Sequence, residues 1–274
     1  MQEVSRYDLL SVLQKAMKYS QKKIFLHRII YIANYTQTAA SDATQNSRVF
    51  NILIDSNIKL INEDYCEDVI TGFGLFYSGY FINIIEGPEE TLIKHLKSLV
   101  NTFDQNFQKS PEVTRMKILL VSHHINKRYY ASWNGRSASP PLLLEKIEQT
   151  DNEASVRQIQ NCIMKLYRMS EYLRNQNPNY LRAAMDNISE LCRHYLPEVN
   201  LLDFLLSCPA LIDLREYIET YGSVPDFSLY RETIWPLPSD FVPKNILGDE
   251  VVKALMSTEA STKVQEEEEE TTEG

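Results

Sequence analysis

One amide interrupts an otherwise apolar stretch of the sequence, GYFINIIEGPEE at residues 79–90. Asn83 lies between Ile82 and Ile84, in a run of residues typical of a buried strand. A carboxamide in such a place either binds a ligand or satisfies another buried polar group, because buried polar atoms are nearly always hydrogen-bonded. Both interpretations of Asn83 stay open on the pattern alone.

Other reactive residue types lack the partners that catalysis needs. Ser122 precedes His123 and His124, but neighbouring residues of a strand point to opposite faces, and no acidic partner or nucleophile elbow is visible. Glu86 could act as a general base. The glycine and proline that follow it favour a role at a helix entry instead, with its carboxylate near the first backbone amides. We therefore expect no enzymatic activity.

Composition and charge exclude further classes of function. The net charge of −9 argues against nucleic acid as the main partner, because phosphate-binding surfaces are usually basic. No apolar run is long enough to span a membrane, and the charged N-terminus has no apolar signal core, so we expect neither a membrane protein nor a secreted one. The scattered cysteines show no metal-ligand spacing and are expected to be reduced, mostly buried thiols of a cytosolic protein: Cys66, Cys162, Cys192 and Cys208.

Alternating helix and strand patterns predict the elements that position these residues. In chain order we expect a strand at 25–36, a helix with Val49, Ile52, Leu53 and Leu60 on one apolar face, a hairpin at 69–87 that turns at Ser78-Gly79, a helix opened by Pro88, and strands at 115–125 and 127–133. This βαββαβ order with one extra strand predicts an α+β, ferredoxin-like sheet with two helices on one face.

The whole chain divides into five predicted segments. They are an N-terminal amphipathic helix (1–24), the sheet domain (25–139), a helical extension (140–221), a proline and aromatic strap (222–250) and an acidic disordered tail (251–274). Within the extension we expect helices at 151–174 and 180–196, followed by shorter helical pieces up to residue 221. The N-terminal helix either packs on the domain or docks a partner.

The strap combines four prolines with large aromatic side chains, so it is expected to be extended. It either wraps its own domain or anchors the chain on a neighbour's surface. For the second interpretation the anchors are Tyr230, Trp235 and Phe241, because large aromatics with few rotatable bonds bury much area at a small entropic cost.

Residues 25–133 resemble the BLUF domain, a flavin-binding blue-light sensor with a ferredoxin-like fold. The matching pieces are LHRIIYIA, ITGFGLFYSGYFINIIEGP and RYYASW. The resemblance implies that Tyr31 stands for the tyrosine of the first strand, that Asn83 holds the place of the glutamine that touches the flavin, and that Trp133 matches the tryptophan of the last strand.

The same resemblance breaks at the residues that would hold flavin. Asn83 is one methylene shorter than glutamine, a loss of about 1.5 Å in reach. Tyr65 and Glu67 fall where the family has asparagine and arginine, which places negative charge where a phosphorylated flavin needs the opposite. We expect a core that has lost flavin and in which Asn83 and Tyr31 satisfy one another. The alternative is a flavin-binding (FAD or FMN) photoreceptor or a light-insensitive flavoprotein.

A second resemblance covers more of the chain. The BLUF-like core, the helical extension and above all ETIWPLPSDF at 232–241 resemble the testis-expressed protein 47 family of ciliated and flagellated eukaryotes. That resemblance implies a non-enzymatic, microtubule-associated component of the axoneme of cilia or flagella. The implied partners are axonemal proteins, tubulin or a radial-spoke-type complex. A signalling adaptor outside cilia is a further alternative.

Overall fold

The computed structural model describes residues 9–20, 24–36, 43–64, 68–105, 112–141 and 152–223. The strap with Tyr230, Trp235 and Phe241 lies outside the described residues, and so do the acidic tail and the predicted flavin-shell positions Tyr65 and Glu67. The first described element is helix α1 (Leu9–Ser20), within the range predicted for the N-terminal helix.

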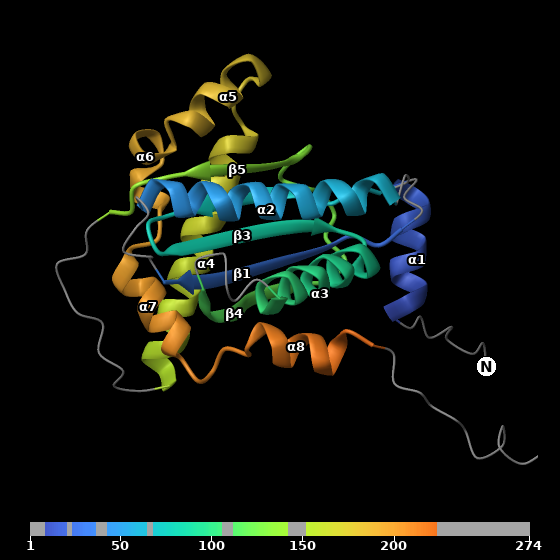
Figure 1. The fold of residues 1–274 in the computed structure, drawn as a ribbon. Helices are drawn as coiled ribbons and strands as arrows, with labels where there is room; N and C mark the ends of the chain where they lie inside the picture. Colours follow the sequence, from blue (N-terminus) through green and yellow to red (C-terminus); the bar gives the residue numbers. More distant parts are fainter. Residues whose placement is uncertain are drawn as a thin grey trace, which may run out of the picture. The chain divides into compact units, whose positions relative to one another are not determined.

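Five strands form one sheet in the order β4-β1-β3-β2-β5 (Figure 1). The strands are β1 (His27–Tyr35), β2 (Thr71–Phe76), β3 (Tyr80–Gly87), β4 (Val113–Ser122) and β5 (Trp133–Ser137). The first four pair antiparallel in the ferredoxin-like order, and β5 adds a parallel strand beside β2. The predicted α+β, ferredoxin-like sheet with one extra strand is confirmed.

Helices α2 (Ala43–Asp64) and α3 (Glu89–Gln105) cover one face of the sheet, as predicted (Figure 1). Each presents an apolar stripe at helical spacing to the strands, and these residues are almost completely buried: Phe50, Ile54, Ile58 and Ile61 from α2, and Leu92, Leu96 and Leu99 from α3. Burial of apolar area on this scale is the main force that holds the helices to the sheet.

The apolar face predicted for α2 points the other way. Val49, Ile52 and Leu60 are 38%, 66% and 64% exposed, whereas the next face round the helix is buried. Leu53, the fourth residue of the predicted face, is partly buried and packs against the core. The prediction was wrong because α2 carries two apolar stripes. A helical period shows that a stripe exists but does not show which of two stripes faces the sheet.

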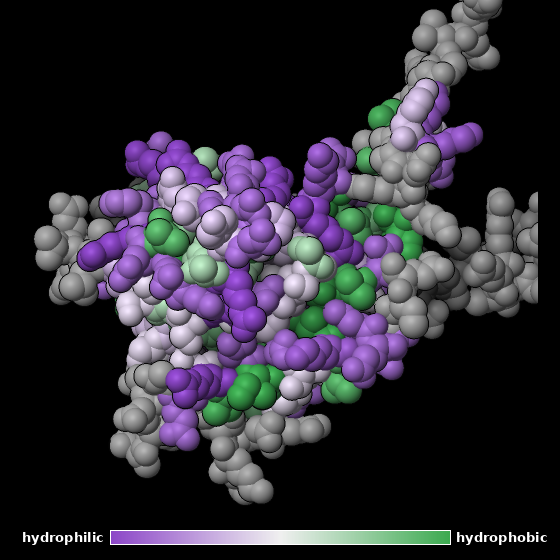
Figure 2. Space-filling model, turned by 90° about the horizontal axis from the view of Figure 1, so that it is seen from above, coloured by the Kyte–Doolittle hydropathy of each residue, from purple (hydrophilic) through white to green (hydrophobic). Residues whose placement is uncertain are grey.

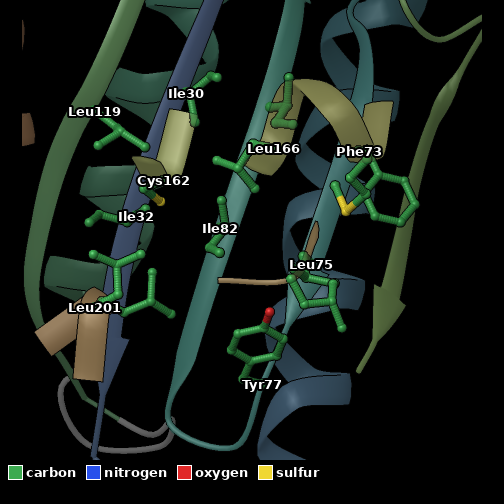
Figure 3. Close-up of a cluster of buried hydrophobic side chains, with 14 of the residues drawn as sticks. Ile30, Ile32, Phe73, Leu75, Tyr77, Ile82, Leu119, Cys162, Leu166 and Leu201 are labelled. Carbon is green, nitrogen blue, oxygen red and sulfur yellow. The ribbon is translucent and has the colours of Figure 1, made fainter. Parts of the chain in front are cut away.

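The helical extension packs against the opposite face of the sheet. Figure 3 shows Ile30, Ile32 and Ile82 pointing from β1 and β3 to the side where Cys162 and Leu166 of α4 lie. The extension comprises α4 (Asn152–Arg174), α5 (Pro178–Asp186), α6 (Ile188–Leu191), the short 3-10 helix η1 (Arg193–Tyr195), α7 (Val199–Ser207) and α8 (Leu214–Tyr221). Sheet and extension therefore share one hydrophobic core.

The predicted helix at 180–196 is broken into α5, α6 and η1. Asn187 has φ −102° and ψ 25°, which lies outside the helical region, and it ends one helix and begins the next. Asparagine competes with helix formation through its own side-chain hydrogen bonds, so a break at this residue is physically reasonable. The last helix, α8, returns to the other side of the sheet, where Leu214 and Tyr217 join the core beneath α2 and α3.

The hairpin turns at Ser78-Gly79, as predicted. Gly79 has φ 92°, a backbone conformation that residues with a side chain rarely adopt, and its carbonyl accepts a hydrogen bond from the Tyr35 amide at 2.9 Å. The turn sets the register in which Asn83 of β3 lies opposite Gly74 of β2, and on its other side Asn83 is paired with Tyr31 of β1.

Glu86 is fully buried and holds the loop that leads into β5. Its carboxylate accepts hydrogen bonds from Arg28 Nε at 2.7 Å and from the backbone amide of Tyr129 at 2.9 Å, with the Tyr130 amide at 3.3 Å. The predicted helix-entry role of Glu86 is therefore wrong. The prediction of a strand at 127–133 is also wrong, because these amides bond a side chain instead of a neighbouring strand, and β5 begins only at Trp133.

Replacing Glu86 by glutamine tests this anchor. Glu86→Gln keeps the shape of the side chain but leaves the Arg28 guanidinium buried without its counter-charge. We expect a loss of about 3–5 kcal/mol in the free energy of unfolding, measured by urea denaturation. Asp186→Asn, which breaks the more exposed ion pair with Arg136, serves as the control and should cost less than about 1 kcal/mol. Equal effects of the two variants would contradict the anchoring role.

Candidate functional site

Three residues singled out in the sequence meet in the core between the sheet and helices α2 and α3. The Asn83 side-chain amide donates from Nδ2 to the Tyr31 hydroxyl at 2.7 Å. The indole Nε1–H of Trp133 donates to Asn83 Oδ1 at 2.9 Å. Asn83 and Tyr31 are completely buried, and Trp133 is 9% exposed. The structure therefore brings Tyr31, Asn83 and Trp133 together, and both ends of the amide have protein partners.

The hydrogen bonds continue beyond Tyr31 into the two helices. The Tyr31 hydroxyl lies 3.2 Å from His95 Nε2 of α3, and His95 Nδ1 lies 2.6 Å from Asn57 Oδ1 of α2. Asn57 Nδ2 then donates to the Ser98 hydroxyl at 2.6 Å. Six side chains from β5, β3, β1, α3 and α2 thus form one buried chain of hydrogen bonds, which we call the amide chain: Trp133, Asn83, Tyr31, His95, Asn57 and Ser98.

All bonds of the amide chain run in one direction. Burial raises the pKa of Tyr31, so its hydroxyl keeps its proton and donates it to the free Nε2 of His95. Burial also lowers the pKa of His95 to about 3, so the ring is neutral. Asn57 Oδ1 can only accept, so the hydrogen of the ring lies on Nδ1 and is donated to Asn57. Each group donates to the next, and no two donors or two acceptors meet.

The sequence analysis did not identify the helix residues of the amide chain. His95 lies on the same helix face as Leu92, Leu96 and Leu99, and Asn57 lies beside Ile54 and Ile58. A polar residue on the apolar stripe of a helix was the available signal, because such a side chain needs a buried partner. Neither the distance in sequence nor the identity of the partner follows from the pattern.

Trp133 also fills space beside the amide. A Cβ atom at Gly74, the residue of β2 paired with Asn83, would lie 2.8 Å from the Trp133 ring, so only glycine admits the indole there. In the BLUF resemblance Asn83 stands where a glutamine touches flavin. Here its amide is bonded to Trp133 and Tyr31, an arrangement that does not fit a flavin held through Asn83.

The histidines after β4 form a separate cluster at the edge of the sheet. His123 and His124 are exposed, and the Nδ1 atoms of His123 and the buried His27 are 2.9 Å apart. Burial lowers the pKa of His27; the charge of Glu89 opposes this shift and the two other histidines add to it. Ser122 points elsewhere, with its hydroxyl 3.4 Å from that of Tyr167. Edge histidines were expected here, and the geometry offers no serine–histidine pair.

Within the described ranges there is neither a metal-binding cluster nor a membrane-spanning helix. No three histidine, cysteine, aspartate or glutamate residues there converge on a possible metal position. None of the described helices is long and apolar enough to cross a membrane. The cysteines at 162, 192 and 208 are buried free thiols, as predicted, and burial raises the pKa of Cys162 to about 12. Cys66, the fourth, lies outside the described residues.

The pH dependence of stability tests the neutral, buried state of His95. Its folded pKa of about 3 lies below the ordinary 6.5, so the unfolded chain binds a proton that the folded chain does not. The stability due to His95 is complete above pH 6.5 and is lost as the pH falls towards 3, by about 1.4 kcal/mol per unit.

The comparison variant is His95→Gln, whose amide does not titrate and can still accept from Tyr31. Urea unfolding between pH 7.5 and 5 should show a steeper loss of stability in the native protein than in the variant. The lowered pKa of His27 acts in the same direction in both proteins and cancels. Identical slopes would contradict the assignment.

Comparisons with known proteins identify a family and several similar solved structures. The family model of Testis-expressed protein 47 matches residues 25–223. Similar solved structures include the BLUF protein BlrB in its dark state, 14% identical over 62% of this chain and 92% of that chain, with a TM-score of 0.30. A bacterial light-regulated adenylyl cyclase is 16% identical over 59% of this chain and 39% of its own, with a TM-score of 0.28.

This chain spans about two fifths of the cyclase chain that it matches. At TM-scores of 0.30 and 0.28 these likenesses add nothing to the fold assignment, which rests on the strand order. The family model, in contrast, extends from the first strand through the last described helix and so includes both the sheet and the helical extension. Because it matches well over half of the sequence, the chain belongs to the testis-expressed protein 47 family.

Proposed function

We propose that this chain is a non-enzymatic structural and docking component of the axoneme of cilia or flagella, with a ferredoxin-like core that does not bind flavin. The observation that carries the proposal is the amide chain. The groups that would contact a cofactor are bonded to one another instead, so the core serves as a rigid body. A rigid core with contact surfaces on its extensions suits a scaffold better than a sensor.

The family supports the location. The family description, a testis-expressed protein, is compatible with a role in the sperm flagellum. The resemblance drawn from the sequence, to a family of ciliated and flagellated eukaryotes, favours the axoneme. The proposed partners are axonemal proteins, tubulin or a radial-spoke-type complex. The net charge of −9 makes direct attraction to the acidic tubulin surface weak, which favours an associated complex as the partner.

The surface supports docking. Figure 2 shows a face that is largely hydrophilic, with hydrophobic residues gathered on the right of the view. Exposed large apolar side chains occur on several described helices, including Met164 on α4 and Tyr180 on α5. We propose that the strap residues Tyr230, Trp235 and Phe241 add the aromatic anchors of the contact.

The alternative is a flavoprotein that binds FAD or FMN, either a blue-light photoreceptor or light-insensitive. The observation that favours it is the direct bond between Asn83 and Tyr31, since the BLUF resemblance implies an amide bonded to this tyrosine. For flavin to bind there, the bond from Trp133 to Asn83 would have to be given up.

The test is sedimentation with axonemes, combined with an absorption spectrum of the purified protein. We expect a protein without a flavin band between 350 and 500 nm (roughly the range in which flavins absorb) that pellets with demembranated axonemes after a salt wash. Trp235→Ala should release much of it into the supernatant, because truncation of a buried aromatic anchor removes a large share of binding energy.

The matched control is Val69→Ala, which truncates an exposed apolar side chain of the sheet domain, outside the extensions and the strap that the proposal uses. It should pellet like the native protein. A bound flavin whose spectrum shifts to the red on illumination would support the photoreceptor instead. Recovery of the native protein in the supernatant would contradict the axonemal proposal.

A further inference from the structure

The second apolar stripe of α2 is a surface without a role in the fold. Val49, Ile52 and Leu60 follow one another at helical spacing and extend over about 16 Å of the helix, with the exposed Ser56 between them. We call these four residues the α2 stripe. The opposite side of α2 already supplies the core, so the α2 stripe is not needed to hold the helix on the sheet.

Exposed apolar residues that are scattered singly need no explanation, whereas apolar residues gathered in one row of a helix mark a candidate contact surface. Two of the three apolar side chains are nearly two-thirds exposed, at 66% for Ile52 and 64% for Leu60. The helix is 22 residues long and extends along the sheet (Figure 1). These features suit the side-by-side packing of another helix.

Charged residues lie along one edge of the α2 stripe, with a positive side chain at one end and a negative side chain at the other. Four charged residues are spaced at steps of seven, four and four along the sequence, which places them on the same flank of the helix: Arg48, Asp55, Lys59 and Glu63. Asp55 and Lys59 bond each other within the helix, with Nζ 2.6 Å from the carboxylate. The positive Arg48 therefore stands at one end of the flank and the negative Glu63 at the other.

We propose that the α2 stripe is a self-association surface, on which α2 of a second copy of this chain packs antiparallel about a two-fold axis near Ser56. The two-fold axis places Arg48 of each copy beside Glu63 of the other, and Ile52 beside Leu60. A parallel arrangement would bring Arg48 to Arg48 and Glu63 to Glu63. The charge order therefore selects the antiparallel pair and supplies its specificity.

This association is independent of the proposed axonemal role. It uses described residues of α2, whereas the proposed anchors lie in the strap. A failure of one proposal leaves the other unchanged, because sedimentation with axonemes and self-association are measured separately.

The test is the molar mass of the full-length chain, measured by light scattering after size exclusion up to roughly 100 µM, a range that detects micromolar dimers. We expect a dimer of twice the 31.8 kDa chain at the upper concentrations. Ile52→Glu should raise the dimer dissociation constant roughly tenfold or more, because it places a charge in the apolar contact. Val156→Glu, at a 47% exposed position of α4, is the matched control and should leave the constant unchanged.

A charge exchange tests the orientation. Arg48→Glu and Glu63→Arg should each raise the dimer dissociation constant roughly tenfold. The contact between positions 48 and 63 occurs twice in the two-fold dimer, and each single variant makes both contacts repulsive. The double variant should recover the native constant to within about threefold. Both positions are exposed, so circular dichroism should show an unchanged fold in all these variants.

The proposal is overturned if the native chain is monomeric throughout the concentration range, or if the dimer does not respond to Ile52→Glu. It is also overturned if the double charge exchange is no better than the single ones. Ser56→Cys gives a second measurement, because two copies of a residue at the axis can form a disulfide between chains. Absence of that cross-linked dimer under oxidation would likewise contradict the antiparallel arrangement.

Discussion

A buried amide must be hydrogen-bonded at both ends, and in this protein that requirement ties the sheet to the helices that cover it. Asn83 lies completely buried at the centre of β3, so its donor and its acceptor both need partners from the core. Tyr31 and Trp133 supply them, and Tyr31 in turn needs His95. One polar residue in the middle strand thereby sets the orientation of side chains on the neighbouring strand β1, on the edge strand β5 and on both covering helices.

The hydrogen bonds of Glu86 form a second buried network, and the amide chain depends on it. Glu86, three residues after Asn83 on the same strand, holds the backbone amides of Tyr129 and Tyr130 and bonds Arg28. The loop fixed in this way leads directly to Trp133, whose indole must reach Asn83 across Gly74. The two networks therefore place the same segment, one through its backbone and the other through its side chain.

The order of elements, the hairpin turn and the buried polar position of Asn83 could be predicted, because hydrophobic period, turn chemistry and an amide in an apolar run are local signals. Tyr31 and Trp133 were assigned only through the resemblance to the BLUF domain. The errors came where the decisive partner is distant. The loop before β5 was taken for a strand because its true partner, Glu86, is more than forty residues away. The α2 helix was assigned the wrong inner face because both of its faces are apolar. His95 was missed because the identity of its partners, Tyr31 and Asn57, shows only in three dimensions.

The central claim is that the amide chain is closed within the protein and runs in one direction, from Trp133 to Ser98. The most direct measurement is the tautomer of His95, read from the nitrogen chemical shifts of its imidazole ring by NMR. The account predicts a neutral ring at pH 6 with the hydrogen on Nδ1, facing Asn57, and a bare Nε2 that accepts from Tyr31. A ring with the hydrogen on Nε2, or a charged ring at that pH, would contradict it.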